Sequence, residues 1–321
     1  MTLRLGTRGS ALALTQSRTV ADSLTRLTGE PVELVEIATA GDRSSAPVQQ
    51  LGVGVFVSAL RDALTAKEID FAVHSYKDLP SAPADGLVIA AVPPREDPRD
   101  ALVTRSGGQL TELGPGSRVG TGAPRRIAQL LALGLGLECV PVRGNVDTRL
   151  RKLADGEFDA LVLAAAGLRR LGRAGEITEF LDPMLMLPAP AQGALAVECR
   201  YDSQAGDGGD LPRLLATLDD EHTRAAVTAE RALLAALEAG CSAPVAALAD
   251  ISETDASPSG GGVSGTGDFE IYLRGAVISA DGGFSVKLSG TGTLTDAEGV
   301  GRRLAAELLA EGAENVLGVH R

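Results

Sequence analysis

Aromatic residues are scarce in this chain. They make up 3 % of its 321 residues, and tryptophan is absent. Proteins that bind single-stranded nucleic acid stack the bases on aromatic side chains, so this composition offers no such platform. The formal net charge is −12, and an acidic chain repels the phosphate backbone. We therefore expect no nucleic acid among its partners.

Cysteine and histidine are equally sparse. The cysteines are Cys139, Cys199 and Cys241, an odd number at wide spacing, and there are three histidines. This pattern gives neither a disulfide framework nor the ligand spacing of a zinc site, so we expect no bound metal. Cys139 and Cys199 lie inside apolar segments and are expected to be small buried side chains.

Long apolar runs are missing as well. No stretch approaches the length of about 18 residues that a membrane span requires. The N-terminal segment MTLRLGTRGS contains no apolar signal stretch. These absences predict a protein that stays in the cytoplasm and does not contact a membrane. No helix with an evident dimer face is present, so we expect a monomer.

Hydrophobic residues nevertheless make up 44 % of the chain, enough for two or three separate cores. Strand and helix patterns alternate in the first 92 residues, from the strand LRLGT to the buried strand LVIAAV. Ser10 is placed to cap the first helix, which is predicted to end near Leu27. This alternation predicts an α/β domain.

Two proline clusters interrupt this pattern, PPREDPRD at 93–100 and LPAPAQG at 187–193. Since proline continues neither a helix nor a central strand, each cluster predicts a crossing between domains. The chain is expected to leave domain 1 (1–93), build domain 2 (98–188) and complete domain 1 with 193–213. Two α/β lobes with two crossings predict a hinged cleft, where ligands usually bind.

The remaining segment, 216–321, has the pattern of a smaller α+β domain. A long helix is predicted from DDEHTR to a stop at Gly240, followed by the antiparallel strands IYLRGAVIS and FSVKLSGTG and a last helix. The stretch from Ser252 to Gly267 is rich in glycine and serine. It predicts a flexible loop without a catalytic role.

The segment HSYKDLP (74–80) directly follows a buried-strand pattern. In an open α/β sheet, residues just past the carboxyl end of a strand face the ligand crevice. This places Ser75, Lys77 and Asp78 at the edge of the predicted cleft. A carboxylate in that position can hold a cation or move protons. The alternative is a surface ion pair between Lys77 and Asp78.

Basic residues are concentrated between Arg118 and Arg173, where ten basic and five acidic residues give a local charge of +5. TRGSALAL, GTGAPRR and RGNVDTR each place arginines beside a predicted helix start, where backbone N–H groups also favour anions. GTGAPRR fits neither the phosphate-binding loop nor the dinucleotide fingerprint. Because the planar guanidinium binds carboxylates through two bonds, we expect a small polycarboxylate rather than a nucleotide.

Cys241 differs from the other two cysteines. It lies in AGCSAP, a glycine turn just past the long helix, where exposure is expected. An exposed thiol in a cytosolic protein can serve as an attachment point or a nucleophile. A thiol enzyme with His222 as its base is disfavoured, because the helix between them, at about 1.5 Å per residue, holds the two about 25 Å apart.

Together, eight segments resemble the porphobilinogen deaminase family, in order and at matching spacing: TRGSALAL, AVHSYKDLP, REDPRDALV, VGTGAPRR, RGNVDTRL, LAAAGLRRLG, LPAPAQGALAVECR and VTAERALLAALEAGCSAP. The resemblance covers residues 3–245 in detail and the rest in outline. It implies two lobes like those of periplasmic binding proteins and a third domain that carries a cofactor cysteine.

The resemblance also implies a reaction. The family carries a dipyrromethane cofactor on a thioether, by position at Cys241, and joins four porphobilinogens to it head to tail with loss of ammonia. Water then releases hydroxymethylbilane (preuroporphyrinogen) for heme and other tetrapyrroles. The product would pass to uroporphyrinogen III synthase.

Residue roles follow from the same resemblance. Asp78, assisted by Lys77, would stabilise the cation left when ammonia departs and help to move protons. Besides Cys241, Lys77 and Asp78, cofactor contacts are implied for Ser10, Ser75, Thr121, Arg125, Arg126, Arg143 and Gly144. Substrate contacts are implied for Arg8, Ser10, Gln16, Arg143, Arg149, Arg170 and Gln192.

Several positions depart from the family pattern. Val53 stands in LGVGVF where a lysine is common, and GTGAPRR replaces GTSSLRR, so hydroxyls are missing at Gly122 and Ala123. Backbone N–H groups remain at these two positions to contact carboxylates.

The main alternative is a two-lobed binder of a small polycarboxylate without catalytic activity. It accounts for the cleft and the arginines, but not for a third domain with Cys241 or for Asp78 beside Lys77. The missing signal stretch counts against a periplasmic binder, and the missing helix-turn-helix segment counts against a transcriptional sensor.

Overall fold

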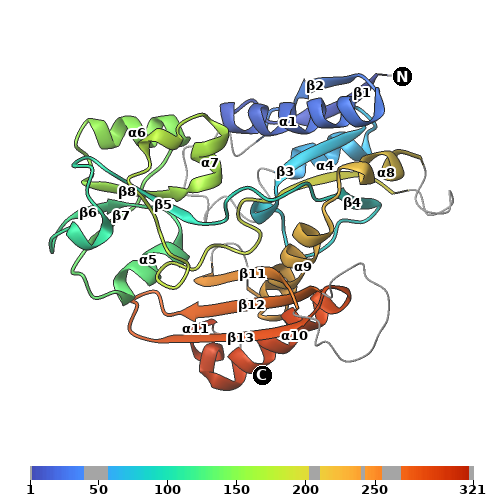
Figure 1. The fold of residues 1–321 in the computed structure, drawn as a ribbon. Helices are drawn as coiled ribbons and strands as arrows, with labels where there is room; N and C mark the ends of the chain where they lie inside the picture. Colours follow the sequence, from blue (N-terminus) through green and yellow to red (C-terminus); the bar gives the residue numbers. More distant parts are fainter. Residues whose placement is uncertain (1, 40–56, 202–209, 240–242, 255–268, 318–321) are drawn as a thin grey trace.

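The computed structural model describes residues 2–39, 57–201, 210–239, 243–254 and 269–317. Three sheets organise these residues into two α/β lobes and a separate C-terminal domain. Figure 1 shows the lobes side by side with the third domain packed below both of them. The expected fold class is confirmed. Across the described ranges, no helix is both long and apolar enough to cross a bilayer.

The first lobe contains a five-stranded sheet in the order β2-β1-β3-β10-β4. Its strands are β1 (Leu3–Thr7), β2 (Val32–Glu36), β3 (Phe71–Ser75), β4 (Leu87–Ala91) and β10 (Leu195–Arg200). The first three are parallel, whereas β10 lies antiparallel between β3 and β4. The chain therefore returns to this sheet after building the second lobe.

Helices α1 (Ala11–Thr28) and α4 (Ser58–Thr65) flank this sheet, and α8 (Asp210–Leu215) packs against its last strands. Ser10 caps α1 as predicted, because its side chain accepts a hydrogen bond from the Ala13 amide. Gly29, in the left-handed conformation at φ 75°, ends the helix. The buried face of α1, including Val20 and Leu24, joins the core of the lobe.

The second lobe contains a sheet in the order β7-β6-β8-β5-β9. Its strands are β5 (Asp100–Thr104), β6 (Arg118–Gly120), β7 (Glu138–Val140), β8 (Ala160–Ala164) and β9 (Glu179–Phe180). Its helices are α5 (Pro124–Ala132), α6 (Val146–Ala154) and α7 (Ala165–Arg170). The chain enters this lobe after β4 and leaves it before β10. The domain boundaries drawn at the proline clusters stay a prediction.

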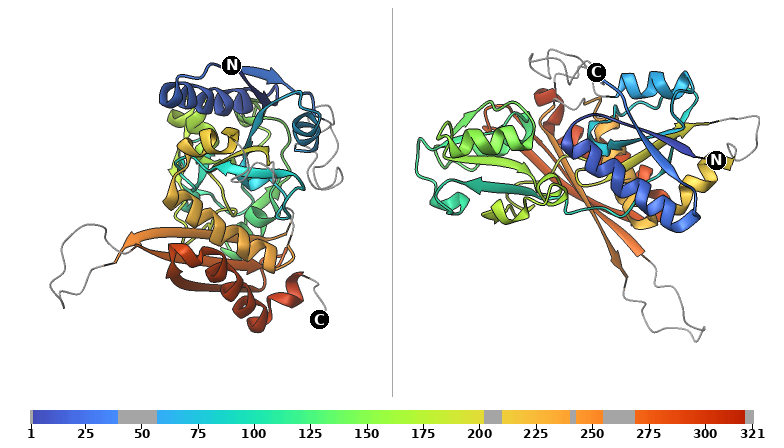
Figure 2. Two further views of the ribbon diagram at one scale, coloured as in Figure 1. Left: turned by 90° about the vertical axis from the view of Figure 1, so that its right-hand side faces the viewer. Right: turned by 90° about the horizontal axis from the view of Figure 1, so that it is seen from above.

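The third domain is a three-stranded antiparallel sheet with helices on one face. It comprises β11 (Val245–Glu253), β12 (Phe269–Ile278), β13 (Ser285–Thr293), α9 (Glu221–Ala236), α10 (Ala297–Leu308) and α11 (Glu314–Leu317). Leu248 and Ile278 on the other face pack with Leu187 and Ala128 of the second lobe. Figure 2 shows the distal ends of β11 and β12 extending away from the body of the protein.

Two local expectations in this domain are wrong. The helix predicted to continue to Gly240 ends at Ala236, and Glu238 takes the left-handed conformation at φ 52°. Leu237 and Ala239 enter the core there, so the chain must leave the helix axis earlier. The loop predicted from Ser252 begins later, because Ser252 still pairs with Glu270 in the sheet.

Candidate active site

A short turn after β3 carries the predicted catalytic pair. Strand β3 pairs with β1 on one side and with β10 on the other, and it ends at Ser75. A 3-10 turn, Tyr76–Asp78, follows directly. Lys77 is half-buried and Asp78 is exposed. The turn thus presents a carboxylate just past the end of a strand, where α/β proteins bind ligands.

The amide of Gln192 connects this turn to the second lobe. Lys77 Nζ donates to Gln192 Oε1 at 3.2 Å. Gln192 Nε2 in turn donates to Asp100 Oδ1 at 2.9 Å and to the Pro98 carbonyl at 2.8 Å. Gln192 is completely buried. One side chain at the second crossing therefore joins a lysine of the first lobe to a carboxylate of the other.

Asp100 is the buried anion of this network, and the sequence analysis assigned it no role. Arg125 Nη1 lies 2.8 Å from its Oδ2, and Arg126 Nη2 lies 2.7 Å from its Oδ1. Burial by itself raises the pKa of Asp100, but the two guanidinium groups outweigh burial and hold that pKa well below its usual range. Asp100 therefore stays ionised and holds both arginines in place.

One signal in the sequence could have identified Asp100. It opens the strand DALVT, in which every residue is buried. A carboxylate at the start of a fully buried strand needs a cationic partner, since an unpaired buried charge is costly. Only the fold of the second lobe, which brings this strand against the start of α5, shows that the partner is the Arg125–Arg126 pair.

Arg125 and Arg126 are themselves almost fully buried. Arg125 also donates to the Leu187 carbonyl at 2.6 Å, and Arg126 to the Val162 carbonyl at 3.0 Å. These bonds and the Asp100 pairing fix both guanidinium groups. The loss of hydroxyls at Gly122 and Ala123 leaves the N-terminus of α5 without a side-chain cap. The Ala123 amide instead donates to Thr121 Oγ1 at 3.4 Å.

Two more of the predicted residues, Gln16 and Arg170, contact segments next to the turn. Gln16, buried on α1, donates from Nε2 to Ser75 Oγ at 3.1 Å. Arg170, at the end of α7, donates to the Gly193 carbonyl at 2.6 Å, one residue beyond Gln192. The first contact joins α1 to the end of β3, two residues before Lys77. The second joins α7 of the second lobe to the segment that contains Gln192.

The other predicted arginines are more open. Arg149 is half-buried and donates to the Gly144 carbonyl at 2.9 Å, while Arg143 and Gly144 are exposed. Gly144 has φ 101°, and a side chain there would collide with Thr148. Arg8 and Ser10 lie at the start of α1, where Ser10 accepts a hydrogen bond from the Ala13 amide.

Charge in this region is predominantly positive. Burial lowers the pKa of Lys77 to about 8 and the pKa values of Arg149 and Arg170 to about 10 each. Arg126 and Arg143 lie close enough to Arg149 to lower its pKa further. Each of these cations would be stabilised by a carboxylate ligand, which makes the region suited to a polyanion.

Some predictions fall outside the described residues. Cys241 lies in the segment 240–242, between α9 and β11, and Val53 lies in 40–56. Cys199 is completely buried, as expected, and Cys139 is half-buried. Within the part of the chain that the structure describes, no cluster of three or more histidine, cysteine or acidic side chains could hold a metal ion.

Two family models match the chain. The model "Porphobilinogen deaminase, dipyromethane cofactor binding domain" matches residues 3–207. The model "Porphobilinogen deaminase, C-terminal domain" matches residues 224–310. Together they span both lobes and most of the third domain.

Curated relatives carry the same name. The porphobilinogen deaminase of Nocardia farcinica is 58 % identical over 315 residues, which cover 98 % of this chain and 88 % of that protein. Porphobilinogen deaminase 1 of Streptomyces coelicolor is 56 % identical over 325 residues, with 98 % and 97 % covered. The Mycobacterium tuberculosis protein is 56 % identical over 315 residues, with 98 % of both chains covered.

Similar solved structures include the methionine-binding protein MetQ, at 14 % identity and a TM-score of 0.43. The match covers 68 % of this chain and 89 % of MetQ. A periplasmic substrate-binding protein from Coxiella burnetii matches at 14 % identity and a TM-score of 0.42, with 67 % and 91 % covered.

Proposed function

Because this chain belongs to the porphobilinogen deaminase family, we propose that the Lys77–Asp78 turn and the buried arginines beside it form the site where porphobilinogen units are joined. The chain is a transferase that polymerises porphobilinogen. The observation that supports the site assignment is the Lys77–Gln192–Asp100 network, which connects the turn that carries Asp78 to the buried arginines of the other lobe.

The donor set fits a carboxylate-bearing cofactor such as dipyrromethane. The network gathers three cations, Lys77, Arg125 and Arg126, against one buried carboxylate, Asp100. A ligand with several carboxylates would balance the excess positive charge. When bound, the dipyrromethane supplies the pyrrole carbon that receives the first substrate unit.

We assign the joining step to Asp78. Each addition breaks the C–N bond of the aminomethyl group, releases ammonia and joins the remaining methylene to a pyrrole carbon, which loses a proton. Asp78 would stabilise the cation that forms when ammonia leaves, accept pyrrole N–H hydrogen bonds and take part in proton transfer. Lys77, held by Gln192, would bind an adjacent carboxylate.

The arginines would hold the growing polycarboxylate. Each porphobilinogen carries an acetate and a propionate, so every addition brings new anionic groups. Arg125 and Arg126 are suited to bind groups close to the turn, with Ser75 and Thr121 assisting. Further groups would meet Arg8, Arg149 and Arg170, which are half-buried, and then the exposed Arg143.

Four finer assignments belong to the same proposal. Cys241 would hold the dipyrromethane through a thioether, since it stands at the family's cofactor position in AGCSAP. The protein would act in the cytoplasm as a monomer. Its product, hydroxymethylbilane, would pass to uroporphyrinogen III synthase.

Turnover of porphobilinogen tests the proposed activity. The purified protein is expected to release one ammonia for each porphobilinogen consumed, and one hydroxymethylbilane for every four. A reaction without protein measures the spontaneous rate. If equilibrium dialysis shows that porphobilinogen binds while no ammonia is released, the protein is a two-lobed binder and the proposal fails.

The lowered pKa of Lys77 leads to a prediction about how activity depends on pH. Because burial lowers the pKa of Lys77 to about 8, the ammonium loses its proton as the pH rises through that value. Its attraction for carboxylates is then lost, so kcat/KM is expected to fall above about pH 8. Lys77→Arg, whose guanidinium stays charged, should remove this fall. An unchanged fall in the Lys77→Arg profile would show that another group titrates.

A further inference from the structure

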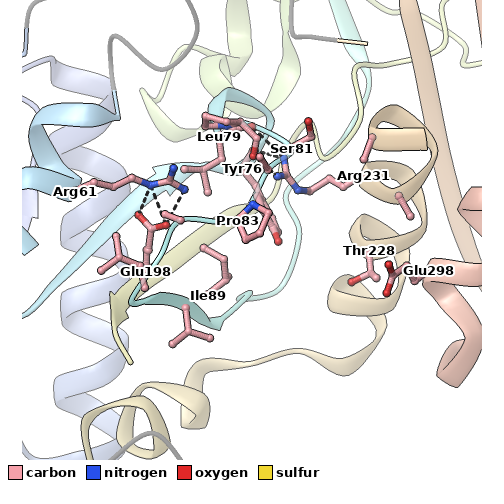
Figure 3. A pocket seen from close by; sticks show the side chains of 17 residues that line it. Arg61, Tyr76, Leu79, Ser81, Pro83, Ile89, Glu198, Thr228, Arg231 and Glu298 are labelled. Atoms are coloured by element: carbon pink, nitrogen blue, oxygen red, sulfur yellow. Dashed lines mark hydrogen bonds and ion pairs between the residues drawn. The ribbon is translucent and has the colours of Figure 1, made fainter. Parts of the chain in front are cut away.

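Helix α9 of the third domain holds the turn that carries Asp78. Arg231 donates from Nη2 to the Pro80 carbonyl at 2.6 Å. Its Nη1 donates to the carbonyls of Leu79 at 3.1 Å and Tyr76 at 3.3 Å. One guanidinium thus binds the backbone on both sides of Asp78. Figure 3 shows this side chain reaching from α9 to the turn.

Apolar packing from this side reaches the turn at Tyr76, which lies against a buried cluster that includes Val227 of α9. A cavity of about 360 Å³ lies between the turn and the third domain, and Tyr76, Leu79, Pro80 and Arg231 all line it. Side-chain packing therefore does not fill this space (Figure 3). The guanidinium also lies 4.5 Å from the centre of the Tyr76 ring, a cation–π contact with the first residue of the turn. Arg231 therefore holds the backbone of the turn, beside the apolar contact that Tyr76 makes.

The helix that presents Arg231 is itself firmly anchored. The preceding residue, Glu230, is completely buried and binds Arg95 through two bonds, at 2.6 and 3.0 Å. It also accepts the Ala249 amide of β11 at 2.8 Å. The Glu230 carboxylate of α9 therefore binds both Arg95, in the first crossing between the lobes, and the backbone of β11. A planar guanidinium on such a helix offers a fixed template for three carbonyls.

We propose that Arg231 is a positioning residue that sets the place of Asp78 relative to the third domain. This inference rests on the proposed function of Asp78. The C-terminal end of α9 leads within a few residues to Cys241, so one helix joins the catalytic turn to the predicted cofactor attachment. A displacement of about 1 Å at a catalytic group can lower a rate by about two orders of magnitude.

The same helix provides a matched control. Arg224 also lies on α9 and also donates to carbonyls of the first lobe, at Ala90 and Ile89, but these belong to β4 rather than to the Asp78 turn. Arg224 pairs with Asp219 at 2.7 Å. Arg224→Met and Arg231→Met therefore both remove a contact between the third domain and the first lobe, and only the second frees the turn.

The test compares these variants as holoproteins whose intact mass shows the cofactor and whose Tm shows folding. Arg231→Met is expected to lower kcat at least about tenfold with KM changed less than about threefold, and Arg224→Met to leave kcat within about twofold. A lysine at this position cannot bind several carbonyls in the planar arrangement of a guanidinium. The kcat of Arg231→Lys should therefore lie between those of the wild type and Arg231→Met. Equal losses in Arg224→Met and Arg231→Met, or no loss in either, overturn the proposal.

A double variant separates positioning from general stability. If Arg231 acts through Asp78, adding Arg231→Met to Asp78→Asn should change the residual rate of pyrrole addition, followed by intact mass, less than about twofold. A further loss as large as in the wild-type background shows that Arg231 acts elsewhere. Failure of the proposed function is distinct, because the wild-type protein itself would then release no ammonia.

Discussion

A Cys241→Ser protein is expected to emerge from purification at its bare sequence mass and to release no detectable ammonia from porphobilinogen. The wild type should be heavier than its sequence by two porphobilinogens less two ammonias. Serine retains the size of the side chain, but its alkoxide is far less available than a thiolate, so the thioether cannot form in the same way. Intact-mass spectrometry and the ammonia assay measure the two consequences on the same samples.

Cys139→Ser is the matched control for this experiment. Cys139 is half-buried in β7, in the second lobe. This variant should keep both the added mass and the activity of the wild type. If Cys241→Ser still carries the added mass, the cofactor is attached to another residue. If the wild type has only its bare sequence mass, the protein carries no covalent cofactor and that part of the proposal fails.

Asp78→Asn should lower kcat by about two to four orders of magnitude while the cofactor mass is retained. Asparagine keeps the shape of the side chain and accepts a hydrogen bond, but it carries no charge and does not take up a proton. The cation formed on loss of ammonia would lose its counter-charge, whereas the arginine contacts to carboxylates would remain. KM for porphobilinogen is therefore expected to change much less than kcat.

Asp85→Asn provides the comparison, since Asp85 is exposed in the loop before β4. It should have wild-type kcat and KM. If Asp78→Asn also retains wild-type kcat, the carboxylate has no part in the chemistry. Arg231 would then have no catalytic group to position, and the inference about it would fail as well. If Asp78→Asn instead lacks the cofactor mass, Asp78 is needed to assemble the site rather than for turnover.

The elements of the lobes could be predicted because their signals are local. Ser10 caps α1, and the buried-strand pattern DFAVHS becomes β3, since helix capping and short apolar runs act over a few residues. The position of Lys77 and Asp78 just past β3 followed from the same pattern. The early end of α9 did not, because it depends on burial of Leu237 and Ala239 in the third-domain core.

The sequence therefore determined, by itself, the class of the protein and the residues suited to its chemistry. The informative signals were composition, the periodicity of strands and helices, and the motifs around Asp78, Arg125 and Cys241. These are properties of the sequence or of short segments in it, so they can be recognised without knowledge of the fold. These segments were sufficient to indicate a polycarboxylate substrate and a family.

Only the tertiary structure decided how those residues are held. Asp100 pairs with arginines 25 and 26 residues away in sequence, Gln192 bridges to Lys77 over 115 residues, and Arg231 reaches the Asp78 turn over about 150. No local pattern encodes such contacts, because they arise when segments distant in the sequence pack together and bury polar groups that must find partners. The sequence names the reacting groups, and the packing of three domains sets their positions.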